Sequence, residues 1–145
     1  MKEDSGIPAE VRKELQEKAI AMLSRSYAPY SHFHVGAALL CRDGKIYTGC
    51  NVENAAFTPS NCAERTAVFK AVSEGEKDFA AICIAGGKDG KATEFCPPCG
   101  VCRQVLEEFC SPDSFRILLT RSDGQMKEFT LRELLPEGFG PSEIS

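Results

Sequence analysis

Two cysteine-bearing stretches that lie far apart in the sequence constrain how this chain can fold. One reads Cys-Pro-Pro-Cys-Gly-Val-Cys at positions 96–102, and the other reads Cys-Ala-Glu-Arg at positions 62–65. Three thiolates can occupy three corners of a tetrahedron around a zinc ion and leave the fourth corner open for water. The pattern therefore predicts a fold that brings both stretches to one hydrolytic site, with one Zn²⁺ per subunit.

Local spacing supports three of the cysteines as ligands. Cys99 and Cys102 are three residues apart, which places both sulfur atoms on one side of a helical turn. Pro98 suits the start of a helix, where unpaired N–H groups and the helix dipole favour a thiolate over a thiol. Cys62 lies at a second predicted helix start, so we expect folding to bring it in as the third ligand.

Charged residues beside these cysteines suggest how such a site would work. Glu64 is expected to carry protons between water and substrate. Three thiolates on Zn²⁺ leave a formal charge of about −1, and Arg65 and Arg103 are expected to offset it by donating to sulfur. Residues two apart on a regular helix point about 200° away from each other. Cys62 and Glu64 can therefore share a site only if the helix begins between them.

Three alternatives remain open for the same residues. Cys99 and Cys102 alone would fit a redox pair, as Cys-x-x-Cys often is in cytosolic proteins. Cys96 could supply a fourth ligand, which would close the metal site and make the protein a non-enzymatic binding module. Glu64 could instead be the acidic partner of a capping box opened by Asn61.

Composition narrows the class of protein. The chain has 145 residues, which fits one domain over residues 1–145. Its 17 basic and 21 acidic residues give a net charge of −4, which argues against nucleic acid as the main partner. We expect no membrane partner and a cytoplasmic location, because no apolar run is long enough to cross a bilayer and the N-terminus lacks the apolar core of a signal peptide. Eight cysteines in a reducing compartment favour metal binding or catalysis over disulfides.

Hydrophobic periodicity predicts alternating helices and strands. The all-apolar run 80–85 indicates a strand that is covered on both faces. The order of elements predicts an α/β fold, a three-layer α/β/α arrangement with a mixed five-stranded sheet. Ligand sites in such folds collect at strand ends. The expected helices are 8–26, 62–74, 101–109 and 130–135, and the expected strands are 35–41, 45–50, 80–85, 115–120 and 126–129.

The motifs around the cysteines resemble those of cytidine deaminases. Cys-Ala-Glu-Arg-Thr-Ala at 62–67 and Pro-Cys-Gly-x-Cys-Arg-Gln at 98–104 are similar to the zinc motifs of the small homotetrameric class, which has three cysteine ligands. Zinc deaminases also use a glutamate that is not a ligand. Further matching blocks are Ala-Pro-Tyr-Ser-x-Phe-x-Val-Gly-Ala-Ala at 28–38, Gly-Cys-Asn-x-Glu-Asn-Ala at 49–55 and Glu-Leu-Leu-Pro-x-x-Phe-Gly-Pro at 133–141. The likeness thus covers nearly the whole chain.

The resemblance implies a reaction and an assembly. Such a protein would be a zinc hydrolase of pyrimidine salvage that converts cytidine and 2′-deoxycytidine to uridine and 2′-deoxyuridine, as a homotetramer with shared active sites. An alternative within the same group is deamination of another cytosine compound, such as the nucleoside antibiotic blasticidin S. The segment 51–54 fits a nucleoside sugar and favours the first substrate class.

The resemblance also implies which residues contact the substrate. Asn51 and Glu53 would hydrogen-bond the ribose 3′-hydroxyl, and alternation along an extended segment places both side chains on one face. Phe33 would line the base pocket, and the Ala63 backbone, with the neighbouring glutamate, would read the pyrimidine edge. Phe139 would reach into the site of a neighbouring subunit and stack there, which would make the tetramer part of the active site.

Overall fold

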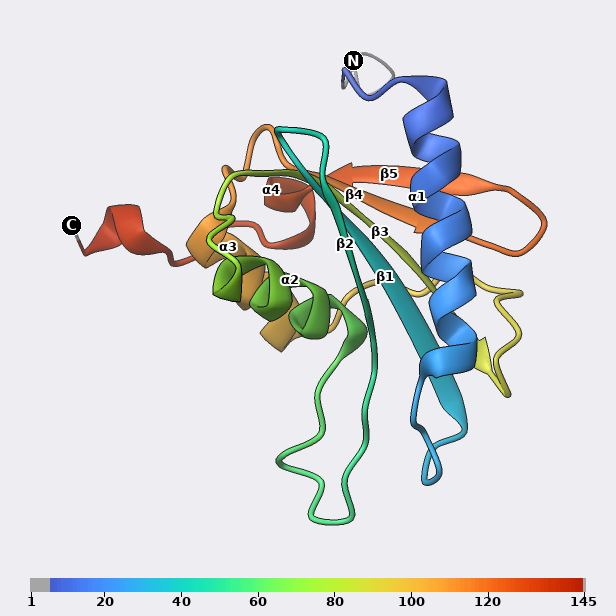
Figure 1. The fold of residues 1–145 in the computed structure, drawn as a ribbon. Helices are drawn as coiled ribbons and strands as arrows, with labels where there is room; N and C mark the ends of the chain where they lie inside the picture. The colour runs from blue at the N-terminus through green and yellow to red at the C-terminus, as the bar shows by residue number, and fades with distance from the viewer. Residues whose placement is uncertain (1–5, 145) are drawn as a thin grey trace.

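A mixed five-stranded sheet forms the centre of the fold in a computed structural model that describes residues 6–144 (Figure 1). The spatial order is β2-β1-β3-β4-β5, in which β3 and β4 pair in parallel and the other neighbours pair antiparallel. The mixed sheet expected from the sequence is confirmed. Its strands are β1 (Phe33–Cys41), β2 (Ile46–Cys50), β3 (Phe79–Lys88), β4 (Arg116–Thr120) and β5 (Met126–Thr130).

Helices cover both faces of this sheet, so the three-layer α/β/α prediction is confirmed (Figure 1). Helix α1 (Ala9–Ala21), continued by the 3-10 turn η2 (Met22–Arg25), lies on one face. Helices α2 (Ala63–Ser73), α3 (Gly100–Phe109) and α4 (Leu131–Leu134) lie on the other, and the short turn η3 (Pro141–Glu143) follows them. No helix within the described residues has the length and hydrophobicity that crossing a bilayer requires.

Alternate residues of the central strands serve two separate cores. Along β1, Ala37 and Leu39 pack with the side chains of α2 and α3, whereas Ala38 and Leu40 pack with those of α1. Strand β3 divides its residues in the same way, and residues 81–85 are all buried. Side chains of a strand alternate between faces, so a strand covered on both sides has no polar position. This accounts for the apolar run in the sequence.

Two glycines let a helix lie directly against the sheet. A Cβ atom at Gly36 in β1 would collide with the carbonyl oxygen of Ala19 in α1. A Cβ atom at Gly49 in β2 would collide with the carbonyl oxygen of Ala63 and would lie 2.6 Å from the Ala67 nitrogen, both in the first turns of α2. The beginning of α2, which follows Cys62, is therefore seated on β2 with no room for a larger residue.

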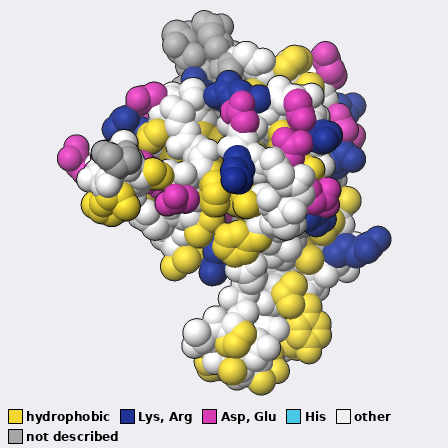
Figure 2. All heavy atoms as spheres, turned by 60° about the vertical axis from the view of Figure 1, so that its left-hand side comes forward, with side chains coloured by type: hydrophobic (Ala, Val, Ile, Leu, Met, Phe, Trp, Pro, Cys, Tyr) yellow, Lys and Arg dark blue, Asp and Glu magenta, His cyan; other side chains and the backbone are white. Residues whose placement is uncertain are grey.

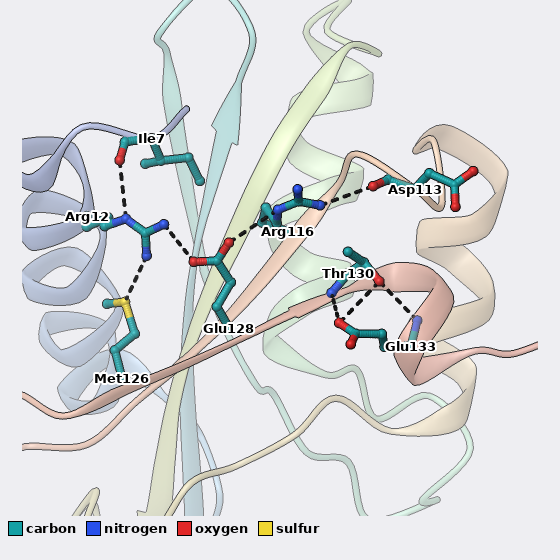
Figure 3. A network of polar contacts seen from close by, with 8 residues as sticks. All are labelled: Ile7, Arg12, Asp113, Arg116, Met126, Glu128, Thr130 and Glu133. Atoms are coloured by element: carbon teal, nitrogen blue, oxygen red, sulfur yellow. Dashed lines mark hydrogen bonds and ion pairs between the residues drawn. The ribbon is translucent and has the colours of Figure 1, made fainter. Parts of the chain in front are cut away.

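A polar network ties α1 to the far edge of the sheet (Figure 3). Arg12 of α1 donates to Glu128 Oε1 on β5 at 2.6 Å, and Arg116 on β4 forms an ion pair with Glu128 Oε2 at 3.2 Å. Beside this network, Thr130 and Glu133 form the capping box that begins α4. One carboxylate on the edge strand thus has an arginine from the helix layer and another from the sheet.

One end of the sheet gathers the segments that carry the cysteines. In the pairing register, Gly36 near the start of β1 lies opposite Cys50 at the end of β2, and Phe33 lies opposite Lys88 at the end of β3. The connections 51–62 and 89–99 leave the sheet from this end and lead into α2 and α3. Segments distant in the sequence thereby come together at the strand ends, where ligand sites were expected.

Candidate active site

The two cysteine stretches meet at the beginnings of two helices. Cys62 is the N-cap residue of α2 and Cys99 is the N-cap residue of α3, and both have an extended backbone, with φ/ψ of −79°/157° and −68°/167°. Cys102 lies in the first turn of α3, and its N–H donates to Cys99 Sγ at 3.5 Å. The Sγ atoms of these three cysteines all lie within 4.8 Å of one another.

The sulfur spacing fits a tetrahedral zinc ion. Zn–S bonds of about 2.3 Å place two corners of a tetrahedron about 3.8 Å apart, and the Cys62 and Cys99 sulfur atoms are separated by 3.6 Å. Cys96 does not belong to this sulfur group. Its Sγ packs instead against Gly86, where an added Cβ would lie 3.0 Å away. Among the described residues this group therefore offers three thiols that could hold one zinc ion.

The surroundings of Cys62 favour its thiolate form. Hydrogen bonds from the Cys102 thiol and from Arg65 lower the pKa of Cys62 to about 5, although burial acts in the opposite direction. The Arg65 guanidinium lies 3.2 Å from the Cys62 sulfur, as expected for a cation that offsets thiolate charge. The same shared hydrogen bond and burial raise the pKa of Cys102. The positive ends of two helix dipoles add to the stabilisation of negative charge here.

Arg103 does not follow the expectation that it donates to sulfur. Its Nε donates to the Pro98 carbonyl at 2.8 Å and its Nη1 donates to the Leu134 carbonyl at 2.7 Å. The residue therefore fixes the backbone just before Cys99 against the end of α4. Its guanidinium donates to two backbone carbonyls, so it supports the segment that carries Cys99 through the main chain.

Glu64 is buried beside the sulfur atoms, with 4% of its surface exposed. Two residues that are two apart within a helix would point in opposite directions, but Cys62 precedes α2 and has an extended backbone. Cys62 and Glu64 therefore line the same cavity. Burial raises the pKa of Glu64 to about 7, and the Cys62 thiolate contributes in the same direction. The capping-box alternative with Asn61 is wrong, because the N-cap is Cys62 and α2 has no side-chain cap.

A cavity of about 370 Å³ is lined by Glu64, Cys62 and Cys99. Four of the five residues expected to contact a substrate line it, namely Phe33, Asn51, Glu53 and Ala63. The fifth, Phe139, lines a different cavity beside α3 and α4 and is 58% exposed. The chain therefore brings the sugar-side and base-side candidates together with the metal ligands, and it leaves Phe139 on the outer surface.

The side chain of Asn51 forms hydrogen bonds that link the ends of β1 and β2. Asn51 Oδ1 accepts hydrogen bonds from the Val35 N–H at 2.8 Å and from the Ser26 hydroxyl. Its Nδ2 donates to the Phe33 carbonyl at 2.8 Å. The amide thus fixes the start of β1, which carries Phe33, against the segment that follows β2.

Glu53 is held by the turn that precedes β1. Its Oε1 accepts from the backbone N–H groups of Tyr30 at 3.0 Å and Ser31 at 3.1 Å, and its Oε2 accepts from the Ser31 hydroxyl. The hydrogen bonds from Ser31 hold the pKa of Glu53 below its ordinary value. Sequence reasoning alone does not single out Ser31. The available signal is its place in the 28–38 block, two residues before Phe33.

Comparisons with known proteins agree with this geometry. The family model described as "Cytidine and deoxycytidylate deaminase zinc-binding region" matches residues 9–116. A cytidine deaminase from Sporosarcina psychrophila is 48% identical over 121 residues, which are 83% of this chain and 85% of the relative. One from Halalkalibacterium halodurans is 45% identical over 134 residues, or 92% and 98% of the two chains.

Solved structures show the same likeness. The crystal structure of a cytidine deaminase from Burkholderia pseudomallei superposes with a TM-score of 0.80 at 43% sequence identity, covering 88% of this chain and 98% of that one. A cytidine deaminase from Mycobacterium tuberculosis superposes with a TM-score of 0.75 at 36% identity, covering 89% and 97%. With its three-cysteine zinc site, the matching family model and these relatives, the chain belongs to the cytidine deaminase family of hydrolases.

Proposed function

We propose that this protein hydrolyses the 4-amino group of cytidine and 2′-deoxycytidine, giving uridine or 2′-deoxyuridine and ammonia. One observation carries the proposal: the buried Glu64 lines the same cavity as Cys62 and Cys99 and the polar residues Asn51 and Glu53. A proton carrier, a metal site and groups suited to a sugar then share one space. The names of the relatives support the choice of substrate.

In this reaction Cys62, Cys99 and Cys102 would hold the zinc ion. When bound, zinc supplies a water that is nucleophilic near neutral pH. Glu64 accepts a proton from the attacking water and delivers it to ring N3 of the base. It then transfers the proton of the new C4 hydroxyl to the leaving amine. A Glu64 pKa of about 7 suits transfer in both directions, because neither form of the carboxyl is strongly favoured near neutral pH.

The remaining residues of the cavity would orient the nucleoside. Phe33 offers a half-exposed ring for the base. The Ala63 backbone and Glu64 would read the N3 and amino edge of the pyrimidine. Glu53 is an ionised acceptor, since its pKa is held below the ordinary value, and Asn51 offers an amide N–H beside it. A sugar hydroxyl can donate to the carboxylate and accept from the amide, which fits the ribose 3′-hydroxyl.

The proposal includes a homotetramer in which Phe139 enters the site of a neighbouring subunit. Figure 2 shows hydrophobic side chains gathered on the lobe at the lower end of the molecule and on the face above it. Exposed apolar patches of this kind mark interaction surfaces. The largest exposed fractions among the big apolar side chains are 77% for Ile144, 72% for Phe57, 58% for Phe139 and 57% for Val101.

The cellular role proposed for this activity is pyrimidine salvage in the cytoplasm. All eight cysteines are free thiols, which suits a reducing compartment. The net charge of −4 suits a small neutral nucleoside better than a nucleic acid.

A direct test incubates the purified protein with cytidine, 2′-deoxycytidine and blasticidin S. We expect loss of cytidine and 2′-deoxycytidine with equal amounts of product nucleoside and ammonia, and slow or no turnover of the antibiotic, because segment 51–54 offers groups for a sugar. A protein that contains stoichiometric zinc and leaves cytidine intact would falsify the proposal. Turnover of blasticidin S without turnover of cytidine would support the alternative function, deamination of another cytosine compound.

The three-cysteine assignment has its own test. Cys96→Ser should keep zinc and near-normal activity, because the Cys96 sulfur packs on Gly86 and lies outside the sulfur group. The matched change Cys99→Ser should lose most of both. Zinc content of the two variants, measured by atomic absorption, decides the matter, and release of the metal by Cys96→Ser would support a closed four-cysteine site instead.

A further inference from the structure

The hydrogen bonds of Glu53 leave it with little spare capacity. A carboxylate oxygen has two lone-pair sites. Oε1 fills both with the backbone N–H groups of Tyr30 and Ser31, at 3.0 and 3.1 Å. Oε2 fills one with the hydroxyl of Ser31. Within residues 6–144, one lone-pair site on Oε2 therefore remains for a ligand.

Asn51, in the same cavity wall, is occupied to a similar degree. Its Oδ1 accepts from both the Val35 N–H and the Ser26 hydroxyl, and one N–H of its Nδ2 goes to the Phe33 carbonyl. From the described part of the chain, one N–H is then left to donate. A single hydroxyl that donates to Glu53 and accepts from Asn51 satisfies both residues, and a second hydroxyl finds no partner at either.

Ser31 joins this sugar side of the cavity to its base side. The Ser31 hydroxyl accepts from the Phe33 N–H at 3.0 Å while it donates to Glu53 Oε2. The backbone of Phe33 is thus linked through one hydroxyl to the Glu53 carboxylate. Between Ser31 and Phe33 the chain turns at His32, whose φ of 57° lies in the left-handed region. That turn brings the Phe33 N–H back to the Ser31 hydroxyl.

We propose that Ser31 is a positioning residue for nucleoside binding: its N–H and hydroxyl fix the rotation of the Glu53 carboxylate so that a single lone pair on Oε2 meets a single sugar hydroxyl. The inference rests on the proposed nucleoside deaminase function. Without the Ser31 hydroxyl, Oε2 has two unfilled sites. The carboxylate then binds water in one of them and loses its fixed orientation toward the sugar.

The test compares cytidine with 3′-deoxycytidine, which lacks only the hydroxyl that Glu53 is proposed to accept. Ser31→Ala should raise the KM for cytidine about tenfold, the size expected for loss of one oriented, charge-assisted hydrogen bond. It should leave kcat within about twofold, because the contact is the same in ground and transition states. For 3′-deoxycytidine both constants should stay within about twofold of wild type.

Two further variants make the experiment specific. Ser31→Thr keeps a hydroxyl at the same place and should restore most of the affinity for cytidine. Ser73→Ala removes an exposed hydroxyl that donates only to the Lys70 carbonyl in α2, at 2.7 Å, and is the matched control for a serine-to-alanine change. On a Glu53→Gln background, Ser31→Ala should add little to the loss already present.

Equal losses on cytidine and 3′-deoxycytidine would show that Ser31 has only a structural role and would overturn the proposal, as would an unchanged KM for cytidine in Ser31→Ala. Failure of the proposed deaminase function would give a different result from failure of the Ser31 proposal. In that case the wild-type protein itself does not convert cytidine, and the positioning role falls with it.

Discussion

Cys62 shows how one backbone position decides the chemistry of a residue. As the N-cap of α2 it is extended, so its sulfur and the carboxyl of Glu64 reach one cavity although the residues are only two apart. The same position places the sulfur at the positive end of the helix dipole and within 3.2 Å of the Arg65 guanidinium. The thiolate is therefore the favoured form at neutral pH.

This thiolate predicts how zinc binding depends on pH. The pKa of Cys62 is lowered from 9.0 to about 5. Its contribution to stability is complete above a pH of about 9, declines as the pH falls, and is gone below about 5. We expect zinc to stay bound near neutral pH and to be released on acidification, because protons compete with the metal for the thiolates. Release can be followed with a chromophoric chelator.

Arg65→Gln provides the matched variant for this titration. Loss of the guanidinium removes a donor to Cys62 Sγ, so the midpoint of zinc release should move upward by about one pH unit. Zinc that is already half released at neutral pH in the wild type, or an unchanged midpoint in Arg65→Gln, would contradict this account of the thiolate.

Single residues also mark the limit of what the sequence can predict. Spacing at predicted helix starts made Cys62, Cys99 and Cys102 candidate ligands, but it left Cys96 open as a fourth, and the distances between the sulfur atoms separate Cys96 from the other three. Arg103 could not be placed, because its acceptors depend on where α4 ends relative to α3. The role of Ser31 could not be predicted either, because its partner Glu53 follows a different strand.

At the scale of elements, the close contact between the start of α2 and β2 positions the site. Gly49 leaves no space between strand and helix at Ala63 and Ala67, the turns that follow the Cys62 ligand. Gly36 plays the same part for α1 on the opposite face of the sheet, at Ala19. The two contacts are alike in geometry and differ only in which helix they position.

This symmetry gives a paired prediction. Gly49→Ala and Gly36→Ala should each destabilise the protein by about 1–3 kcal/mol, because an added methyl group forces backbone apart. Gly49→Ala alone should also weaken zinc binding and activity, since it displaces the helix that carries Glu64. Denaturant unfolding and zinc affinity measured on both variants check this. Equal effects on zinc would mean that α2 is not specifically positioned by the contact.

The order of elements was predictable from periodicity, whereas their ends were less so. Strand β3 extends to Lys88, beyond the predicted 80–85, because Gly86 and Gly87 pair with the start of β1. Glycine has no apolar side chain, so a prediction from hydrophobic periodicity ends the strand before Gly86. The last part of the predicted helix 8–26 is the 3-10 turn η2 in the structure, a distinction that apolar spacing does not make.

At the scale of the whole molecule, the position of Phe139 is the feature that a single chain does not explain. It is 58% exposed and lies beside a cavity separate from the one that holds Glu64. A large aromatic side chain in this place suits contact with another copy, and the proposed tetramer gives it a role in a neighbouring site.

Complementation between two defective variants tests the shared site. Phe139→Ala should lower activity about tenfold or more, and Glu64→Gln should be nearly inactive. In mixed oligomers made by co-expression, a Phe139→Ala subunit keeps Glu64 and can take Phe139 from its Glu64→Gln neighbour. We expect activity well above the sum of the separate variants. Activity no greater than that sum, in oligomers verified as mixed by light scattering and tag capture, would place Phe139 outside the neighbour's site.

The central claim is that a buried carboxyl beside a three-cysteine zinc site performs the proton transfers of cytidine deamination. Its most direct test measures cytidine turnover and zinc content together in the wild type and in Glu64→Gln. We expect about one zinc per subunit in both proteins, with turnover in the variant lower by at least about a hundredfold. A zinc-loaded Glu64→Gln protein with near wild-type turnover would contradict the claim.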